Sequence, residues 1–264
     1  MRRGPCLVII LILFSAALVS PAAPAQDAAM WSAPAFNGGV FVTPVPGAPF
    51  SAEVTQEMTQ VLKDGSAFQR KTTALIARDS EGRIRNERHQ VVPASSTQDP
   101  ALLVIHLYDP TTRTSLLLNP FTHIASQNIL TRPPATVPPA NWAQNEPANR
   151  RLPPNIREED LGASDIDGIE AHGYRRTLTV SEKASGTGKP VNVVDEYWYS
   201  EELHLDLIRK HDDPRTGSQA ITVTKLNVNE PPAELFEVPP EYKVVDVTPP
   251  EQQGESHNPV RVVR

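Results

Sequence analysis

Residues 50–62 read FSAEVTQEMTQVL, and this stretch decides the fold class because its apolar and polar residues alternate. Alternation with a period of two is typical of a strand that buries one face and exposes the other. Asp64-Gly65 follows directly, and this dipeptide favours a tight β-hairpin. One parity carries Phe50, Ala52, Val54, Met58 and Leu62, and the other carries Ser51, Glu53, Thr55 and Glu57.

Strand-like segments continue on both sides of a proline-rich interruption. The most apolar run, residues 102–108 (LLVIHLY), suits a strand that is covered on both faces. Asp109-Pro110, Asp167-Gly168 and residues 213–217 (DPRTG) are turn signals between segments. We predict a mainly β fold, with one helical turn at residues 232–236. The other expected strands are residues 68–78, 83–92, 114–118, 123–129, 160–164, 169–180, 191–199, 203–207, 220–228 and 244–247.

The first 25 residues have the features of a secretory signal peptide. Arg2 and Arg3 precede an apolar run, residues 7–19 (LVIILILFSAALV), that is too short to cross a bilayer comfortably. Ala23-Pro24-Ala25 supplies the small residues that favour cleavage after Ala25. An uncleaved N-terminal anchor is the alternative. We expect a mature chain that does not span the membrane and is periplasmic or secreted.

The rest of the chain divides by composition. We expect an irregular lead-in at residues 26–49, a β domain at 50–247 and a polar, disordered tail at 248–264. Residues 131–154 hold seven prolines, a density that excludes a helix or a central strand. This segment either divides two domains or is an insertion between two halves of one sheet. We favour the insertion, because each half alone has few strands to close a core.

The composition excludes several functional classes. There are 25 Lys and Arg residues against 31 Asp and Glu, a formal net charge of −6. A general nucleic-acid binder would need a basic surface, so we expect no nucleic-acid partner. Cys6 is the single cysteine and would leave with the signal peptide, which removes thiol catalysis, disulfides and Cys-ligated clusters from the mature chain.

No catalytic or metal-binding pattern can be read from the sequence. The seven histidines form no H-E-x-x-H motif, and no G-x-S-x-G motif occurs. Residues 186–189 (GTGK) fail the phosphate-loop pattern, because Lys183 and Pro190 stand where Gly and Ser or Thr are required. Asp165 and Asp167 precede a glycine at the wrong offset for a calcium loop, so turn chemistry is favoured. We expect a protein that is not an enzyme and has no cofactor or metal.

Tyr197-Trp198-Tyr199 is the densest aromatic cluster of the chain. Strand alternation places Trp198 on one face and both tyrosines on the other. Packing in the core with cross-strand pairs is the favoured interpretation. The alternative is an aromatic wall of a groove that binds a hydrophobic ligand.

Three motifs together resemble a known superfamily. They are Leu107-Tyr108-Asp109-Pro110, Glu196-Tyr197-Trp198-Tyr199-Ser200 and residues 235–242 (LFEVPPEY), and the likeness extends over residues 50–247. In this combination the chain resembles the LolA/LolB-like outer-membrane lipoprotein-sorting proteins and the related RseB-type sensors. The resemblance implies a curved antiparallel sheet that forms an incomplete, half-open β-barrel with few short helices. It also implies a concave face that holds acyl chains.

Two functions from different classes follow. The first is an exported binding protein that carries or senses a lipid or the acyl chains of lipoproteins, since an unfilled curved sheet exposes apolar surface. The alternative is a non-catalytic protein-interaction module of the cell envelope, acting through exposed strand edges or the proline-rich segment. The candidate ligand-binding residues are Val54, Met58, Phe68, Leu75, Leu103, Ile105, Leu107, Trp198, Leu205 and Leu207.

The signal-peptide assignment makes a direct prediction. N-terminal sequencing of the exported protein should begin at Gln26, because signal peptidase cuts after a small residue at the end of the A-x-A motif. Recovery of intact Met1 in a membrane fraction would show that the apolar run is an anchor instead.

Overall fold

The computed structural model describes Val40 and residues 42–131 and 152–249. All the described residues belong to one unit. Four expected features fall in whole or in part outside the described residues: the signal peptide, residues 26–39 of the lead-in, residues 132–151 of the proline-rich segment and residues 250–264 of the tail.

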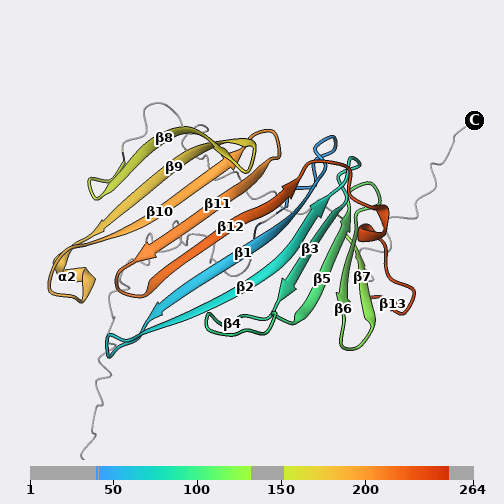
Figure 1. Cartoon of the computed structure of the whole chain (residues 1–264), viewed down its shortest axis with the longest axis horizontal. Helices are drawn as coiled ribbons and strands as arrows, with labels where there is room; N and C mark the ends of the chain where they lie inside the picture. Colours follow the sequence, from blue (N-terminus) through green and yellow to red (C-terminus); the bar gives the residue numbers. More distant parts are fainter. Residues whose placement is uncertain (1–39, 41, 132–151, 250–264) are drawn as a thin grey trace, which may run out of the picture. The chain divides into compact units, whose positions relative to one another are not determined.

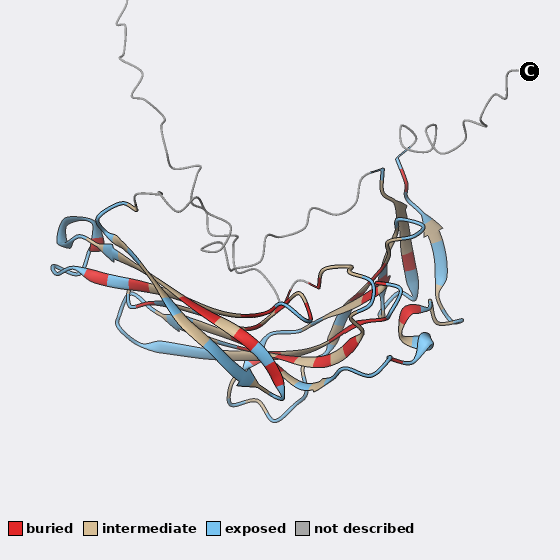
Figure 2. Ribbon diagram, turned by 90° about the horizontal axis from the view of Figure 1, so that it is seen from above, coloured by how far each residue is buried: buried red, intermediate tan, exposed pale blue. Residues whose placement is uncertain are grey.

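In the described residues, 13 strands form one curved sheet that does not close into a barrel (Figures 1 and 2). The first group comprises β1 (Phe50–Val61), β2 (Ala67–Arg78), β3 (Ile84–His89), β4 (Val92–Pro93), β5 (Leu102–Asp109), β6 (Thr114–Asn119) and β7 (Ile124–Ile129). The second group comprises β8 (Ile156–Ile166), β9 (Ile169–Val180), β10 (Val191–Ser200), β11 (Leu205–Asp213), β12 (Gly217–Asn227) and β13 (Lys243–Asp246). The helical elements are α2 (Glu182–Ser185) and the 3₁₀ helix η1 (Ala233–Phe236).

The two groups of strands join in the middle of the sheet. The strand order is β13-β7-β6-β5-β3-β2-β1-β12-β11-β10-β9-β8, with β4 paired to β2 at the side (Figure 1). β1 pairs antiparallel with both β2 and β12, so strands from either side of the proline-rich segment share one hydrogen-bonded sheet. The mainly β fold with an open, curved antiparallel sheet and few short helices is confirmed. One departure is β13, which pairs with β7 in parallel.

The turns follow from local chemistry. Asp167 and Gly168 have φ angles of 55° and 86°, the two left-handed conformations that a two-residue type I′ hairpin requires. Ile166 pairs with Ile169 across this turn, so the dipeptide fixes the register of β8 and β9. At the first hairpin, Asp64 Oδ1 accepts hydrogen bonds from the Ser66 backbone N–H and hydroxyl at 2.9 and 2.6 Å. Short polar side chains that bond the backbone in this way stabilise turns.

Register divides the strands' side chains between two faces of the sheet. The sheet has a concave and a convex side (Figure 2), and the inner face is the concave one. Register places Phe50, Val54 and Met58 of β1 on one face together with their cross-strand partners Arg78, Ala74 and Arg70 of β2, and we assign this set to the inner face. The outer face is the convex side. The middle of the inner face is the main core, where Phe50, Ile76 and Ile221 are each no more than 1 % exposed.

Arg78 is the largest fully buried side chain of this core. Its Nε donates to Ala48 O at 2.8 Å, its Nη1 to Thr43 O at 2.8 Å and its Nη2 to Leu203 O at 2.7 Å. Its guanidinium lies 5.0 Å from the centre of the Phe50 ring. Burial lowers the pKa of Arg78 to about 10, so the side chain stays charged at neutral pH. It fastens the end of the lead-in to the inner face.

The outer face has its own cover at one end. Ile105, Leu107, Leu118 and Ala125 form a buried cluster, against which Val238 and Tyr242 pack. The segment from η1 to Tyr242 therefore acts as a strap over β5, β6 and β7, and we call it the C-terminal strap. Arg85 Nη1 donates to Leu235 O at 3.0 Å and ties the strap to β3.

Several local expectations differ from the structure. The short helix α2 was not expected; it leads into the loop that holds residues 186–189, and Gly186 ends it with a φ of 71°. β8 begins at Ile156, earlier than the expected residue 160, because its first residues pair with β9 up to Leu178. Thr248 was expected in a disordered tail, yet it is buried, and its hydroxyl accepts from the Ile129 N–H at 3.0 Å.

We predict that Arg78→Met lowers the free energy of unfolding by about 3 kcal/mol or more, because it leaves three buried carbonyls without a charged donor. Urea denaturation followed by circular dichroism measures the change. Arg157→Met is the matched control, since that side chain is 75 % exposed in its ion pair with Glu159. A loss no larger than that of the control would contradict the anchoring role.

Candidate functional site

The ten residues expected to bind a ligand divide between the two faces of the sheet, and the structure does not bring them together. Val54, Met58 and Phe68 lie on the inner face, whereas Leu75, Ile105, Leu107 and Trp198 lie on the outer face. Leu103 and Leu207 are the extra residues of β-bulges in β5 and β11, and Leu205 lies beyond the bulge in β11.

These residues also differ in exposure. Val54, Ile105, Leu107, Leu205 and Leu207 are buried, each no more than 4 % exposed. Phe68 and Leu103 are 45 % and 37 % exposed. A buried side chain that packs inside a cluster offers no free surface to a ligand, so the exposed positions are the better guide to a binding site.

Trp198 lies against the sheet on its outer face. A Cβ atom at Gly173, its cross-strand partner, would come within 2.8 Å of the Trp198 ring, so the ring uses the space that a glycine leaves. The indole Nε1–H donates to Glu196 Oε1 at 3.0 Å, and Glu196 also bonds Arg175 Nη2 at 2.7 Å. Cross-strand packing therefore accounts for the position of this side chain.

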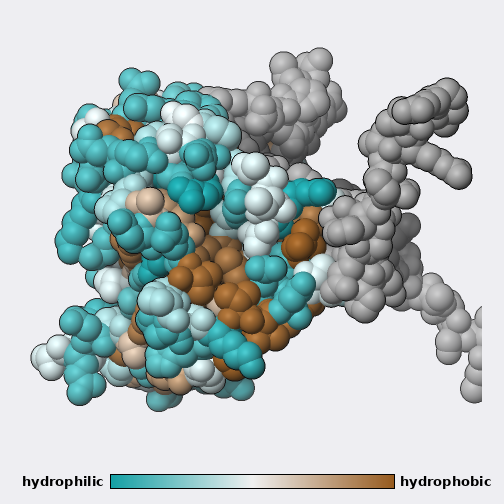
Figure 3. Space-filling model, turned by 90° about the vertical axis from the view of Figure 1, so that its right-hand side faces the viewer, coloured by the Kyte–Doolittle hydropathy of each residue, from teal (hydrophilic) through white to brown (hydrophobic). Residues whose placement is uncertain are grey.

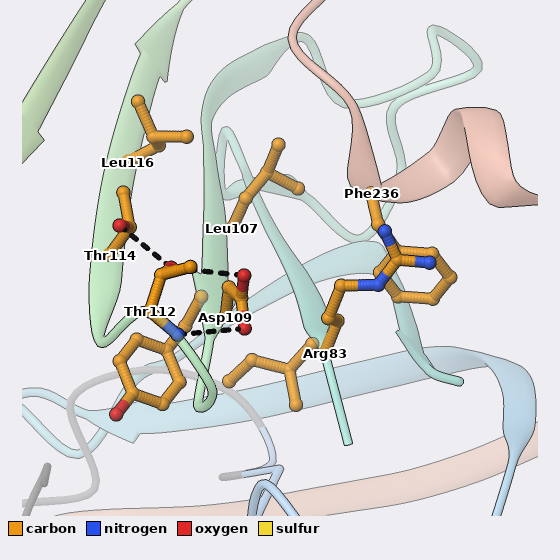
Figure 4. Close-up of a pocket in the computed structure, with 9 residues that line it drawn as sticks. Arg83, Leu107, Asp109, Thr112, Thr114, Leu116 and Phe236 are labelled. Carbon is orange, nitrogen blue, oxygen red and sulfur yellow. Dashed lines mark hydrogen bonds between the residues drawn. The ribbon is translucent and has the colours of Figure 1, made fainter. Parts of the chain in front are cut away.

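A small cavity lies where the C-terminal strap meets the sheet. It has a volume of about 190 Å³ and is lined by Leu107, Leu116 and Phe236 and by polar groups at the β5–β6 turn (Figure 4). Pockets for drug-sized ligands measure about 300–1,000 Å³. This cavity can admit a side chain or the end of an acyl chain, but not a whole lipid.

The polar rim of this cavity is already engaged. Asp109 accepts from the backbone N–H of Thr111 at 2.8 Å and from the Thr112 hydroxyl at 2.9 Å (Figure 4). Arg83 pairs with Asp79 at 2.5 Å, and its guanidinium lies 5.4 Å from the Phe236 ring centre. These contacts hold the β5–β6 turn and the strap in place, and they leave the rim with little free hydrogen-bonding capacity.

Exposed apolar side chains gather at the end of the sheet formed by β6, β7 and β13 (Figure 3). Leu117 and Ile124 project from the inner face of β6 and β7, and Phe121 lies in the turn between these strands. Val244 and Val247 lie on and just after the edge strand β13. We call this set the β6–β13 surface; its exposed fractions are 50 % for Leu117, 67 % for Phe121, 39 % for Ile124, 48 % for Val244 and 53 % for Val247.

Sequence reasoning did not select this surface. Leu117 and Ile124 stand in short strands of mixed polarity, and their exposure depends on which face the C-terminal strap covers. The signal available in the sequence was the apolar Phe121 within a turn, where a polar residue is usual. A contiguous apolar surface on a folded chain is a common mark of an interaction site.

A second notable cluster is polar and half-buried. Asp206 lies at the β-bulge of β11, with its Oδ2 3.8 Å from Arg209 Nε, and its buried Oδ1 has no hydrogen-bond partner among the described residues. Arg209 lies over the Tyr197 ring at 5.6 Å. Burial raises the pKa of Asp206 to about 6 despite the nearby Arg209, and burial also raises the pKa of Tyr197 to about 12.

In the part of the chain that the structure describes, no group of three or more His, Cys, Asp or Glu side chains is arranged to hold a metal ion. Among the same residues, no helix is both long enough and apolar enough to cross a membrane.

Comparisons with known proteins give similarity of fold. No protein-family model and no curated protein matches the sequence. An uncharacterized conserved protein from Thermus thermophilus has a similar solved structure, with 9 % identity, a TM-score of 0.38, and coverage of 76 % of this chain and 91 % of that chain. A chain of the Pseudomonas aeruginosa MucA/MucB complex shows 14 % identity and a TM-score of 0.34 over 75 % of this chain and 58 % of that chain.

A LolA superfamily protein from Nitrosomonas europaea is also similar in structure, with 12 % identity, a TM-score of 0.28, and coverage of 73 % of this chain and 91 % of that chain. The likeness is distant and concerns the fold alone.

Asp206 generates a pH prediction. Its pKa rises from an ordinary 3.8 to about 6 in the fold, so ionisation destabilises the folded state as pH increases through this range. Relative to Asp206→Asn, the wild type should lose about 2 kcal/mol of unfolding free energy between pH 4 and pH 7.

Urea denaturation at the two pH values measures this difference. Asp212→Asn, an exposed position on the same strand, is the control for the loss of one negative charge. Parallel pH profiles for the wild type and Asp206→Asn would show that the carboxyl ionises normally.

Proposed function

We propose that this chain is an exported, non-catalytic binding protein of the bacterial cell envelope that holds an apolar chain of the kind found in lipids and lipoproteins. The ligand lies on the β6–β13 surface and extends onto the inner face of the sheet. The mature chain, from Gln26, works in the periplasm. The exposure of five large apolar side chains at one end of the sheet carries this proposal.

The physical support is the cost of leaving this surface in water. Each large apolar side chain gains about 1.5–3 kcal/mol when it passes from exposure to full burial. Leu117 and Ile124 lie on neighbouring strands of the inner face, and Phe121 lies in the turn that joins them. A flexible hydrocarbon chain can cover all three without the shape complementarity that a folded partner needs.

A second candidate function is docking of a protein partner at the free edge of β13. β13 pairs with β7 alone in the described sheet. Lys243 and Val247 donate their N–H groups to His123 O and Gln127 O on β7, so alternation turns the Val244 N–H away from β7. An extended peptide could add to this edge through its main chain.

Binding of a fluorescent fatty-acid probe to the mature protein tests the first function. The wild type should bind saturably in the micromolar range. Leu117→Asp and Ile124→Asp should each weaken binding at least tenfold, because a carboxylate under an acyl chain loses its hydration. Both positions are well exposed, so the variants should fold.

Leu62→Asp is the matched control, since Leu62 is 45 % exposed in the β1–β2 hairpin, away from the proposed surface. It should bind the probe like the wild type. Equal losses in all three variants would show that the probe does not use this surface. If the wild type binds no acyl probe, the carrier function fails and docking at β13 becomes the leading candidate.

A further inference from the structure

Charged side chains are sorted between the two faces in the half of the sheet from β1 to β7. These strands contain four acidic residues, Glu53, Glu57, Glu87 and Asp109, and register places all four on the outer face. Three arginines, Arg70, Arg78 and Arg88, lie on the inner face of the same strands. In a chain with a formal net charge of −6, the concave side of this half is therefore locally cationic.

The guanidinium of Arg78 donates hydrogen bonds to three backbone carbonyls, whereas Arg70 keeps an N–H donor that a ligand could use. Arg70 Nη2 donates to Gln60 Oε1 at 3.0 Å, and the guanidinium lies 5.6 Å from the Phe68 ring centre. Its Nε–H is buried and has no acceptor in the part of the chain that the structure describes. Buried donors in folded proteins almost always have a partner, so this one marks a place where an acceptor is missing.

Thr72, on the same strand, also has a buried polar atom that needs a partner. It is 8 % exposed, and its buried Oγ1 has no hydrogen-bond partner within residues 42–131 and 152–249. Arg70 and Thr72 are two residues apart, so both point to the inner face about 7 Å from each other. Their β1 partners Met58 and Gln56 carry no charge.

Arg88 completes the group from the neighbouring strand. Asn86, two residues before Arg88 on the same face of β3, is the last residue of that strand that pairs with β2, opposite Ile76. Arg88 is exposed, and among the described residues it forms no ion pair. The nearest titratable side chain on the inner face of β5 is His106, which pairs with Asn86 and whose pKa burial lowers. We call Arg70, Thr72 and Arg88 the inner cationic site.

An apolar strip starts at this site. Val104 of β5 pairs with Arg88, and Leu117 of β6 and Ile124 of β7 lie further along the same face, next to their polar cross-strand partners His106, Ser126 and Asn119. Three strand spacings separate β3 from β7, a distance of about 14 Å. The strip ends at the β6–β13 surface, so cationic and apolar surface lie end to end on one concave face.

We infer that the inner cationic site binds the anionic head group of an amphiphile whose hydrocarbon chain lies along the Val104–Leu117–Ile124 strip. This inference rests on the proposed function and narrows its ligand to a chain that ends in a carboxylate or a phosphate. Arg70 Nε and Thr72 Oγ1 donate to the head-group oxygens, and Arg88 adds a second positive charge. Charge-assisted hydrogen bonds of this kind are stronger than neutral ones.

Titration of the mature protein with three ligands of equal chain length tests the inference. Dodecanoate supplies a carboxylate, dodecyl phosphate a phosphate, and dodecanol has no charge. The wild type should bind both anions at least tenfold more tightly than dodecanol, and the tighter anion identifies the head group. Raising the salt concentration should weaken binding of the anions and leave dodecanol unchanged.

Variants assign the effect to residues. Arg70→Met should weaken binding of the preferred anion about tenfold, and Thr72→Val and Arg88→Gln should weaken it severalfold, with dodecanol unaffected. Lys71→Met is the control, because Lys71 lies between Arg70 and Thr72 but points to the outer face. Circular dichroism shows whether each variant folds, and Thr72→Val preserves side-chain volume if Arg70→Met does not fold.

The outcomes separate the head-group site from the proposed function. If dodecanol binds as tightly as the anions, or if Arg70→Met behaves like Lys71→Met, the cationic site is wrong while acyl binding stands. If no amphiphile binds, the proposed function fails, and inorganic phosphate is titrated alone by NMR. Shifts at the Arg70 and Thr72 amides would then retain an anion site, and their absence would overturn it.

Discussion

The buried guanidinium of Arg78 is the interaction on which the rest of this fold depends. Its three donors reach carbonyls at positions 43, 48 and 203, which belong to the lead-in and to the approach to β11. One side chain of β2 thus holds together segments from the beginning and the end of the described chain. Because a buried charge is stable only when its donors are satisfied, these three segments must be in place together.

This constraint explains how an open sheet can have a core at all. A single curved sheet has no second layer to cover its concave side, and its central residues would face water. The lead-in fills part of that role, since Val40 and Val42 are 2 % and 1 % exposed and Asn86 donates to Val40 O at 3.0 Å. On the outer face, the C-terminal strap covers Ile105 and Leu107 in the same manner. The lead-in and the C-terminal strap each cover only part of their face. The rest of the sheet surface stays accessible to a ligand.

The sequence predicts the strands and their turns well, because both depend on neighbouring residues. Alternation in β1 and the Asp167-Gly168 dipeptide give the right elements at the right places. Alternation does not show which side chains of one strand lie on the same face of the sheet as those of the next strand. Val54 and Ile105 look alike in sequence, yet they lie on opposite faces, and Ile105 packs under the strap.

The arginines were missed for a related reason. In an alternating strand pattern, an arginine is assigned to the side of the strand that faces solvent. For this reason Arg70 and Arg78 were not expected to be site residues. Arg78 is fully buried and Arg70 has a buried Nε only because of long-range partners and the curvature of the sheet. Cross-strand pairing of Phe50 with Arg78 and of Met58 with Arg70 places both on the apolar parity of β1. Such information exists only once the register is known.

The two free edges of the sheet show why binding should concentrate at one end. β8 forms one edge with charged side chains, including the Arg157–Glu159 pair at 2.9 Å and Asp160 bonded to His172 at 2.6 Å. Charges on an edge strand oppose pairing with another chain. β13 at the other edge is protected by its shortness, four residues, but carries the exposed Val244 on the outer face, opposite Ala125. Exposed apolar side chains and a free edge therefore occur together at β13, whereas the free edge at β8 carries charged side chains.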